Sequence, residues 1–332
     1  MRAVRVHGQG EPAAVVRVDE VDAPEPGSGR VRVRVGAAAA NLPDVMMCRG
    51  SYPIRPERPF VLGLEAAGVV DAVGDGVEPH MIGQRVVGVT DLPHGGFAEW
   101  SIIPADRAYR VPDAVSDADA VATLIAFQTA HLALHRRGAL TAGETLLVLG
   151  AAGGVGSAAI QLGKVAGARV IAVARDADKQ EHCRAIGADV VLDSASADLA
   201  ADIRAVTDDH GVDVVFDPVG GDAYERAVEA LATDARVLLV GFADGVQHID
   251  PGAVLRKSYS VIGVYVGAYS NDDDGRRFLH QVQAEIFAAL EGGRIRAVID
   301  RTVDLDGVAD ALEQLAARRV VGKIVVVPSS DD

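Results

Sequence analysis

The segment Thr145–Gly156, which reads TLLVLGAAGGVG, constrains the fold of this chain more than any other feature. An apolar run enters a cluster of glycines, and a segment with helical periodicity follows at once. This order is typical of a buried strand, a tight turn and a helix N-terminus that hold the pyrophosphate of a dinucleotide. Gly150 and Gly153 are expected to turn the chain, and Gly156 to let the helix pack closely on the strand. We expect the phosphate-binding turn to comprise Gly150, Ala152, Gly153, Gly154, Val155 and Gly156.

From about residue 126 onward, short apolar segments alternate with amphipathic ones. Six apolar strands linked by helices predict a doubly wound parallel sheet, with its ligand at the carboxyl ends of the strands. The expected strands are Leu146–Leu149, Val170–Ala174, Val190–Leu192, Val212–Phe216, Val237–Val240 and Val261–Val264. The expected helices are Val155–Ala166, Ala177–Ile186, Ala197–Thr207 and Ala223–Leu231.

Residues 1–125 are instead a series of short strands separated by Gly and Pro. Valine and arginine alternate in Arg30–Val35, which is the period of a half-buried strand. The other expected strands are Met1–Val6, Ala14–Val18, Gly68–Val73, Arg85–Val89 and Phe97–Ile103. This pattern predicts an antiparallel, barrel-like domain. The tail, with helices near Phe278–Leu290 and Leu305–Ala317 and a strand over Lys323–Val327, is expected to return to it. The predicted domains are therefore 1–125 with 269–332, and 126–268.

The composition narrows the class of protein. With 332 residues the chain is long enough for two separate cores. A net charge of −15 argues against nucleic acid or an anionic membrane as a main partner. No apolar run approaches the roughly 20 residues of a membrane span, and the first residues lack a signal-peptide core. The two cysteines, Cys48 and Cys183, form no disulfide framework. We expect a cytoplasmic protein.

Several segments, which the end of this paragraph lists in chain order, give the chain a family resemblance along essentially its whole length. The chain resembles the zinc-independent quinone oxidoreductases of the medium-chain dehydrogenase/reductase superfamily. This implies a Rossmann dinucleotide-binding domain and a GroES-like, mostly antiparallel β-barrel domain. The segments are NLPDVMMCRGSYP (Asn41–Pro53), PFVLGLEAAGVV (Pro59–Val70), GFAEW (Gly96–Trp100), FQTAHLAL (Phe127–Leu134), LGAAGGVG (Leu149–Gly156), DPVGGD (Asp217–Asp222) and GKIVVVP (Gly322–Pro328).

The departures from the zinc-bearing alcohol dehydrogenases of this superfamily bear on the chemistry. Those enzymes have Cys where this chain has Asn41, and Gly-His-Glu where it has Gly63-Leu64-Glu65. A four-cysteine zinc lobe cannot be made from two thiols. We therefore expect no zinc. Without a metal to lower the pKa of an alcohol, the favoured acceptors are those whose reduced anion is delocalised. Quinones and other conjugated carbonyls qualify, and the resemblance implies hydride transfer to them from a reduced nicotinamide.

The resemblance also implies candidate catalytic residues. Asn41 would bind near the nicotinamide ribose or the substrate, and Tyr52 would orient or protonate a substrate oxygen. Thr129 resembles a threonine that approaches the nicotinamide ring. Met46 stands where some relatives have a second aromatic residue, which predicts a more apolar pocket. Cys48 is expected to be an inert thiol.

The choice of cofactor is expected to depend on the end of the second sheet strand. NAD-dependent enzymes usually place a carboxylate there, whereas this chain has Ala174 followed by Arg175 and, four residues on, Lys179. We therefore expect NADPH rather than NADH, with both cations near the 2′-phosphate. Asp176 would weaken this preference if it turned inward. The resemblance further implies cofactor contacts at Ser194, Arg318 or Arg319, Gly241, Phe242 and Tyr265. Lys323 would either reach the cofactor or cap an edge strand.

Two further expectations concern partners and activity. The apolar edge Ser260–Tyr265 is expected to pair with a second copy and form a homodimer. The leading hypothesis is an NADPH-dependent quinone oxidoreductase that acts on small electron-poor acceptors. The alternatives are an enoyl or 2-haloacrylate-type C=C reductase that uses NADPH, and a non-catalytic NADPH-binding protein.

Overall fold

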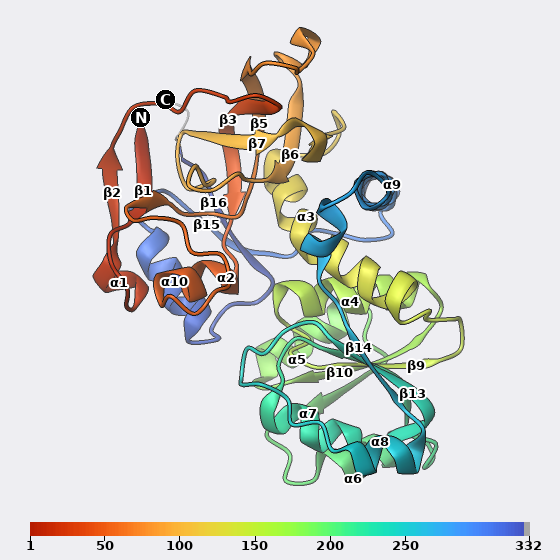
Figure 1. The fold of residues 1–332 in the computed structure, drawn as a ribbon. Helices are drawn as coiled ribbons and strands as arrows, with labels where there is room; N and C mark the ends of the chain where they lie inside the picture. The colour runs from red at the N-terminus through yellow and green to blue at the C-terminus, as the bar shows by residue number, and fades with distance from the viewer. Residues whose placement is uncertain (329–332) are drawn as a thin grey trace. The chain divides into compact units, whose positions relative to one another are not determined.

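The structure of the protein, a computed structural model, describes residues 1–328 (Figure 1). The chain divides into two compact units. The first consists of Met1–Ile125 together with the chain from Ser270 onward, and the second of Ala126–Tyr269. The second border lies one residue beyond the predicted one. Helix α3 (Asp117–His131) begins in the first unit and ends in the second, where the chain continues as a π-helical turn, Leu132–Arg137.

The second unit is a six-stranded sheet in the order β11-β10-β9-β12-β13-β14, in which every neighbouring pair is parallel. This confirms the predicted doubly wound sheet. The strands are β9 (Thr145–Val148), β10 (Arg169–Ala174), β11 (Val190–Asp193), β12 (Val212–Asp217), β13 (Leu231–Leu239) and β14 (Ser260–Gly263). The helices are α4 (Gly154–Val165), α5 (Ala177–Ala185), α6 (Leu199–Val206), α7 (Gly221–Val228) and α8 (Pro251–Lys257). Apolar side chains such as Leu147, Ile171 and Val215 form its core.

Two local predictions were wrong, one in the second unit and one in the first. Helix α7 ends at Val228 instead of Leu231, because Leu231 opens β13 and pairs in parallel with Val212. The predicted strand Ala14–Val18 begins only at Val16, because the residues before it form a helical turn, α1 (Pro12–Val15). Proline at the first position of a helix favours such a turn, because the fixed φ of proline is close to the helical value. The N–H that proline lacks would have no partner within the helix at this position.

The first unit contains two sheets that are mostly antiparallel, as predicted. The smaller has the order β2-β1-β4, and the larger the order β15-β16-β3-β5-β6-β8, with β7 also paired to β3. The strands are β1 (Arg2–Val6), β2 (Val16–Glu20), β3 (Arg30–Ala39), β4 (Phe60–Val61), β5 (Glu65–Val73), β6 (Arg85–Val89), β7 (Trp100–Pro104), β8 (Ala108–Arg110), β15 (Ile299–Val303) and β16 (Lys323–Val326). The helices besides α1 and α3 are α2 (Leu42–Cys48), α9 (Asp273–Glu291) and α10 (Val308–Ala316), and short 3₁₀ turns lie at Pro79–Met81, Ala105–Arg107 and Val266–Ser270.

The C-terminal strand returns to the N-terminal part of the chain. Val325 of β16 pairs antiparallel with Ala39 of β3, and β3 in turn pairs antiparallel with β5. The carboxyl end of β3 therefore lies beside the amino ends of β16 and β5. This arrangement brings three sequence segments, far apart in the chain, to one place in the first unit.

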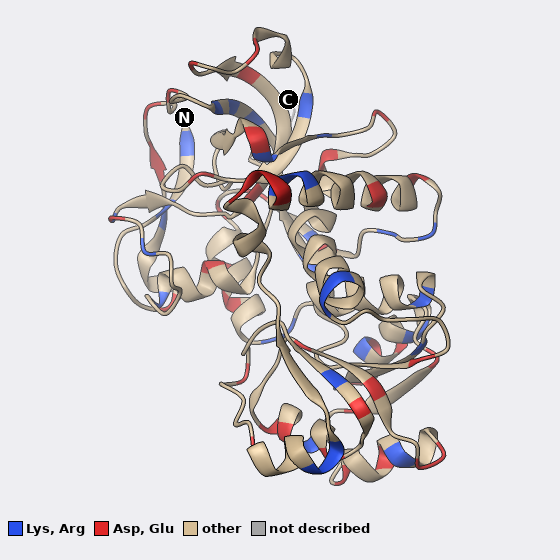
Figure 2. Cartoon of the chain, turned by 45° about the vertical axis from the view of Figure 1, so that its right-hand side comes forward, with Lys and Arg blue, Asp and Glu red and all other residues tan. Residues whose placement is uncertain are grey.

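Charged residues lie on many elements of both units (Figure 2). Acidic and basic positions are interspersed along the helices and strands, and an acidic run begins α9. Within residues 1–328, no helix combines the length and the apolar character that crossing a bilayer requires.

Candidate active site

The glycine-rich turn of the second unit follows β9. Gly150 has a φ of +58°, and the N–H of Gly153 donates to the Gly150 carbonyl over 3.1 Å, which closes a tight turn before α4. A Cβ atom at Gly150 would lie 2.8 Å from Val219 Cγ2. At Gly156, a Cβ atom would lie 2.4 Å from the Gly150 carbonyl oxygen. The two glycines are thus required by backbone conformation and by the close approach of helix and turn.

The same turn leaves a row of backbone donors at the start of α4. The first N–H groups of a helix have no partner within it, and here they follow Gly153, whose extended backbone is the N-cap of α4. A Cβ atom at Gly153 would have only one neighbour within 4 Å, the Gly150 oxygen at 3.4 Å. The bare backbone and the positive end of the helix dipole suit an anion such as a phosphate.

The cations that the sequence assigns to cofactor choice lie just after β10: Arg175 follows the strand directly, and Lys179 lies on α5. Arg175 is exposed, and it forms no ion pair with any residue in the described part of the chain. Lys179 Nζ lies 3.5 Å from Asp176 Oδ2, and the Asp176 side chain is 62% exposed. Asp176 therefore does not turn inward. The N–H of Ser194 donates to the Ala174 carbonyl, which places Ser194 next to the end of β10.

A buried carboxylate that the sequence analysis did not single out organises the loops after β12 and β13. Asp217 Oδ1 accepts the N–H groups of Val219 and Gly220, each over 2.8 Å. Its Oδ2 accepts Gln247 Nε2 over 2.9 Å, and the same amide donates to the Gly241 carbonyl. Asp217 has no exposed surface. Side chain and backbone thus fix both loops at the carboxyl edge of the sheet. The signal in the sequence was a carboxylate directly after an apolar strand.

Two aromatic residues of this unit are unusually exposed. Phe242 follows β13 and is 57% exposed, and Tyr265 follows β14 and is 61% exposed. Large apolar side chains left in solvent mark a surface that a ligand or partner can cover. Both lie beyond the carboxyl ends of their strands, where the sequence analysis placed cofactor contacts.

In the first unit, three polar side chains meet where β16, β3 and β5 adjoin. Lys323 Nζ donates to Glu65 Oε1 over 2.7 Å and to Asn41 Oδ1 over 2.6 Å. Asn41 Nδ2 donates to Glu65 Oε1 over 2.8 Å and to the Ala39 carbonyl over 3.1 Å. Glu65 is fully buried and Lys323 is 5% exposed. Strand β16 lies between β15 and β3, so Lys323 does not cap a sheet edge.

Glu65 was not assigned a role from the sequence, although one signal was present. It is a single charge within the otherwise apolar segment VLGLEAAGVV. A lone carboxylate at such a position is stable only when it is paired. Its partners, Lys323 and Asn41, lie 258 and 24 residues away in the chain, so spacing alone could not reveal them.

Next to this cluster, Asp44 and Cys48 are buried on α2. Asp44 Oδ2 accepts the N–H of Asn41 over 2.7 Å, and burial raises the pKa of Asp44 to about 7. Burial likewise raises the pKa of the Cys48 thiol to about 12. A thiol with that pKa is protonated at neutral pH and is a poor nucleophile and metal ligand. The expectation of an inert Cys48 agrees with this environment.

The remaining predicted residues are divided between the units. Tyr52 is half-buried and packs against the core of the first unit, close in sequence to half-buried Met46. Arg318 follows α10 in the first unit, with a φ of +59°. Thr129 is half-buried in the last turn of α3, three residues before the π-helical turn, and belongs to the second unit. Of the predicted residues in the first unit, Asn41 and Lys323 are in direct contact.

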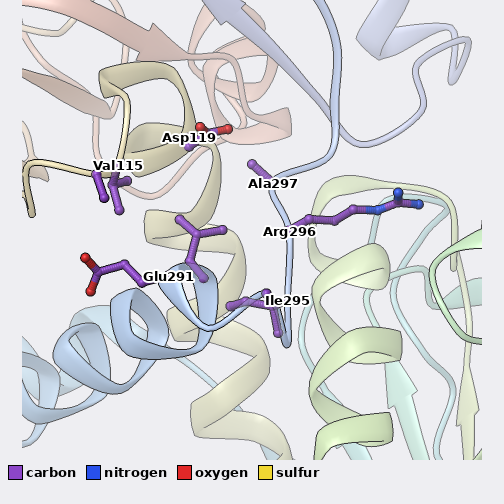
Figure 3. A pocket seen from close by; sticks show the side chains of 9 residues that line it. Val115, Asp119, Glu291, Ile295, Arg296 and Ala297 are labelled. Carbon is purple, nitrogen blue, oxygen red and sulfur yellow. The ribbon is translucent and has the colours of Figure 1, made fainter.

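The first unit also contains a cavity of about 360 Å³ between the start of α3 and the end of α9 (Figure 3). Asp119 and Glu291 line it, and in the close-up Arg296 points away from both. None of the predicted site residues lines this cavity. It is therefore not the site that the sequence analysis describes.

The two units match two known families. Residues 27–113 match the alcohol dehydrogenase GroES-like domain, and residues 154–281 match the zinc-binding dehydrogenase family. The second description names a metal, so the donor atoms near Asn41 have to be compared with those that zinc prefers. Zinc binds thiolates, imidazoles and carboxylates. Here Leu64 has no donor atom, and the Asn41 amide oxygen accepts a hydrogen bond from the Lys323 ammonium group. This set of residues does not suit zinc.

Relatives and solved structures agree over nearly the whole chain. The chain is 32% identical to quinone oxidoreductase-like protein 2 homolog of Nematostella vectensis, over 98% of this chain and 88% of that protein. It is 29% identical to the quinone oxidoreductase of Sus scrofa over 98% of each chain. The structure of Escherichia coli quinone oxidoreductase complexed with NADPH superimposes with a TM-score of 0.92, at 29% identity, over 99% of this chain and 100% of that one. The chain is therefore an oxidoreductase that belongs to the quinone oxidoreductase-like members of the medium-chain dehydrogenase/reductase superfamily.

Proposed function

We propose that the protein is an NADPH-dependent quinone oxidoreductase that works without zinc. The observation that carries this proposal concerns the two positions where the zinc-bearing enzymes have Cys and His: Leu64 has no donor atom, and Asn41 Oδ1 accepts a hydrogen bond from Lys323 Nζ over 2.6 Å. A relative of known structure is complexed with NADPH, and others are quinone oxidoreductases by name. The phosphate-binding turn and the exposed Arg175 add support from this chain's own residues.

The pyrophosphate of NADPH would lie on the turn formed by Gly150, Ala152, Gly153, Gly154, Val155 and Gly156. The turn fits it, because side chains are absent where the phosphates approach and the first amides of α4 are available as donors. Gly241, Phe242 and Tyr265 would bind the nicotinamide half. When bound, NADPH supplies a hydride.

The preference for NADPH over NADH would come mainly from Arg175. Its guanidinium has no carboxylate partner in the described part of the chain, whereas Lys179 is engaged by Asp176 over 3.5 Å. The 2′-phosphate would therefore meet one free cation and no inward-facing carboxylate. Ser194 and Arg318 would add contacts to the adenine half. A charge-assisted hydrogen bond contributes roughly 1.5–3 kcal/mol, which corresponds to about tenfold or more in affinity.

Asn41 and Tyr52 of the first unit would contact the acceptor, and Thr129 of the second unit would approach the nicotinamide ring. Tyr52 or water would give the final proton to the reduced oxygen. The acceptor gains one hydride, a hydrogen nucleus with two electrons, from the cofactor and one proton from this donor, so that a quinone becomes a hydroquinone. An unactivated alcohol would need its proton removed first, a step for which a metal is the usual device. A quinone needs no such step.

We further propose that the protein forms a homodimer through β14. This strand is the outer strand of the six-stranded sheet, and Ser260 and Gly263 at its ends are exposed. An unpaired edge strand offers N–H and C=O groups to a second copy, and a twofold contact closes the assembly.

One experiment tests the proposed function. Purified protein is offered 1,4-benzoquinone, 9,10-phenanthrenequinone, an enone and an acrylic acid, with NADPH or NADH, and the same sample is analysed for metals. We expect the highest kcat/KM with a quinone and NADPH, at less than 0.1 zinc per chain, that is, well below ~1 per site. Faster reduction of the C=C acceptors, or stoichiometric zinc, would contradict the proposal. NADPH binding without consumption would contradict it as well.

A further inference from the structure

The first unit contains a buried cation with an unused donor. Lys323 is the first residue of β16, and its side chain is 6% exposed. The ammonium group has three N–H bonds. Glu65 Oε1 accepts one of them over 2.7 Å and Asn41 Oδ1 accepts another over 2.6 Å. The third has no acceptor among residues 1–328. A buried N–H without a partner is costly, so this one is suited to an oxygen atom that arrives with a ligand.

The neighbours of Lys323 have no donor left for such an oxygen. Both N–H bonds of the Asn41 amide are used, by Glu65 Oε1 and by the Ala39 carbonyl. Asn41 can therefore accept a hydrogen bond from a ligand hydroxyl but cannot donate one to a carbonyl. Glu65 only accepts, and its second oxygen is taken by the N–H of Ile125 over 3.0 Å. Within this cluster, Lys323 alone can donate to a ligand.

The charges of the cluster also favour this role. The ammonium group is held between a carboxylate and an amide oxygen, so its position is fixed before any ligand binds. A preorganised, poorly solvated cation stabilises a developing oxyanion more strongly than water does.

We propose that Lys323 is a catalytic residue whose third N–H donates to the acceptor oxygen that becomes negative during reduction. This inference rests on the proposed function, because it takes a quinone as the acceptor. Lys323 keeps its proton throughout. The acceptor receives one hydride, a hydrogen nucleus with two electrons, from the nicotinamide, and the proton that completes the hydroquinone comes from Tyr52 or water. Glu65 and Asn41 are positioning residues that hold the ammonium group in place.

The first part of the test separates this role from a purely structural one. Lys323→Met removes the charge and leaves Glu65 buried and unpaired, so the variant is expected to unfold at lower denaturant. Lys323→Met/Glu65→Gln removes both charges and is expected to recover most of the lost stability. We expect the double variant to bind NADPH within about threefold of wild type, by nucleotide fluorescence, and to lose about 100-fold or more in kcat/KM for a quinone whose hydroquinone is strongly basic. Lys164→Met/Asp189→Asn removes an exposed ion pair of 2.7 Å and is the matched control.

The second part uses a series of 1,4-benzoquinones whose hydroquinones differ in acidity. If Lys323 stabilises the oxyanion, the loss in kcat/KM grows as the hydroquinone becomes more basic, from about tenfold to more than 100-fold. An equal loss for every quinone, or recovery of activity together with stability in the double variant, would overturn the proposal. Where Lys323→Met does not fold, the double variant and Lys323→Arg are compared with wild type. If the wild-type protein reduces no quinone at all, the proposed function itself is wrong. The unfolding and NADPH-binding measurements would still show what the Lys323–Glu65 pair contributes to stability and to cofactor binding.

Discussion

Asp44 and Asn41 close the start of α2 from inside the protein: Asp44 Oδ2 accepts the backbone N–H of Asn41 over 2.7 Å, and Asp44 has no exposed surface. Its other carboxyl oxygen has no hydrogen-bond partner among the described residues. Burial therefore disfavours the carboxylate and raises the pKa of Asp44 from 3.8 to about 7. Asp44 therefore exchanges its proton near neutral pH, one turn of helix from the Asn41–Glu65–Lys323 cluster.

This raised pKa makes stability depend on pH. The unfolded chain loses the Asp44 proton near its usual pKa of 3.8, whereas the folded chain keeps it until about 7. Between these values the folded state binds more protons, so the free energy of unfolding falls as pH rises through this window. The interval corresponds to roughly 4 kcal/mol. Asp44→Asn is expected to remove this fall, so that the variant gains stability over wild type between pH 4 and pH 8.

The measurement is urea unfolding of both proteins at several pH values. Asp274→Asn is the control, because the Asp274 side chain is 89% exposed. It should shift the curve by less than about 0.5 kcal/mol at any pH. A parallel pH dependence in wild type and Asp44→Asn would show that Asp44 titrates normally.

Two glycines of the phosphate-binding turn should respond differently to alanine. Gly156→Ala places a methyl group 2.4 Å from the Gly150 oxygen, so the helix must move and we expect a loss of about 1–3 kcal/mol in stability. At Gly153, the nearest atom would be 3.4 Å away and φ is −78°, so the fold should tolerate Gly153→Ala.

The cofactor should separate the two variants further. The methyl group of Gly153→Ala would stand where a phosphate approaches the backbone, and we expect NADPH affinity to fall at least about tenfold. Thermal unfolding without cofactor and NADPH titration measure the two effects. Unchanged NADPH affinity in Gly153→Ala would remove this residue from the phosphate site.

The sequence predicted the parts of the site that depend on local pattern. The tight turn from Gly150 to Gly156 was predicted because strand, glycines and helix are contiguous, whereas the cofactor role of Arg175 stays a prediction. The six strands of the second unit were predicted because each contains a short apolar run, although β13 begins at Leu231, six residues before the predicted start at Val237. The antiparallel first domain followed from the two-residue period of segments such as Arg30–Val35.

What could not be predicted depends on contacts between distant segments. The pairing of β16 with β3 brings Lys323 to Asn41, and no local pattern encodes this contact. The Asp217–Gln247 contact likewise joins residues that are 30 positions apart. The predicted end of α7 was wrong because Leu231, which has good helix propensity, is the first residue of β13 and pairs with Val212 across the sheet. Tertiary contacts decided each of these features.

The Asp217–Gln247 pair leads to a prediction about the loops of the sheet edge. Gln247→Leu leaves one buried oxygen of Asp217 without a partner and releases the Gly241 carbonyl. We expect a loss of about 1–3 kcal/mol in unfolding free energy, together with a severalfold higher KM for NADPH because Gly241 belongs to the proposed nicotinamide site. Gln314→Leu is the control, since its hydrogen bond to Asp310 is exposed. Equal stability of the two variants would mean that the buried contact contributes nothing.

The last prediction concerns the recognition of the 2′-phosphate. Arg175→Ala should raise the KM for NADPH about tenfold and leave the KM for NADH nearly unchanged, because only the phosphorylated nucleotide presents a charge to this guanidinium. Inhibition by 2′,5′-ADP should weaken in parallel, while inhibition by 5′-AMP should not. Arg184→Ala is the matched control: Arg184 lies on the neighbouring helix α5 and pairs with Glu181 at the surface. Steady-state kinetics with both nucleotides measures this difference. A change of equal size in the KM for NADPH and for NADH would assign Arg175 to binding the common part of the cofactor or to folding. The preference for NADPH would then have to come from Lys179 or Arg318.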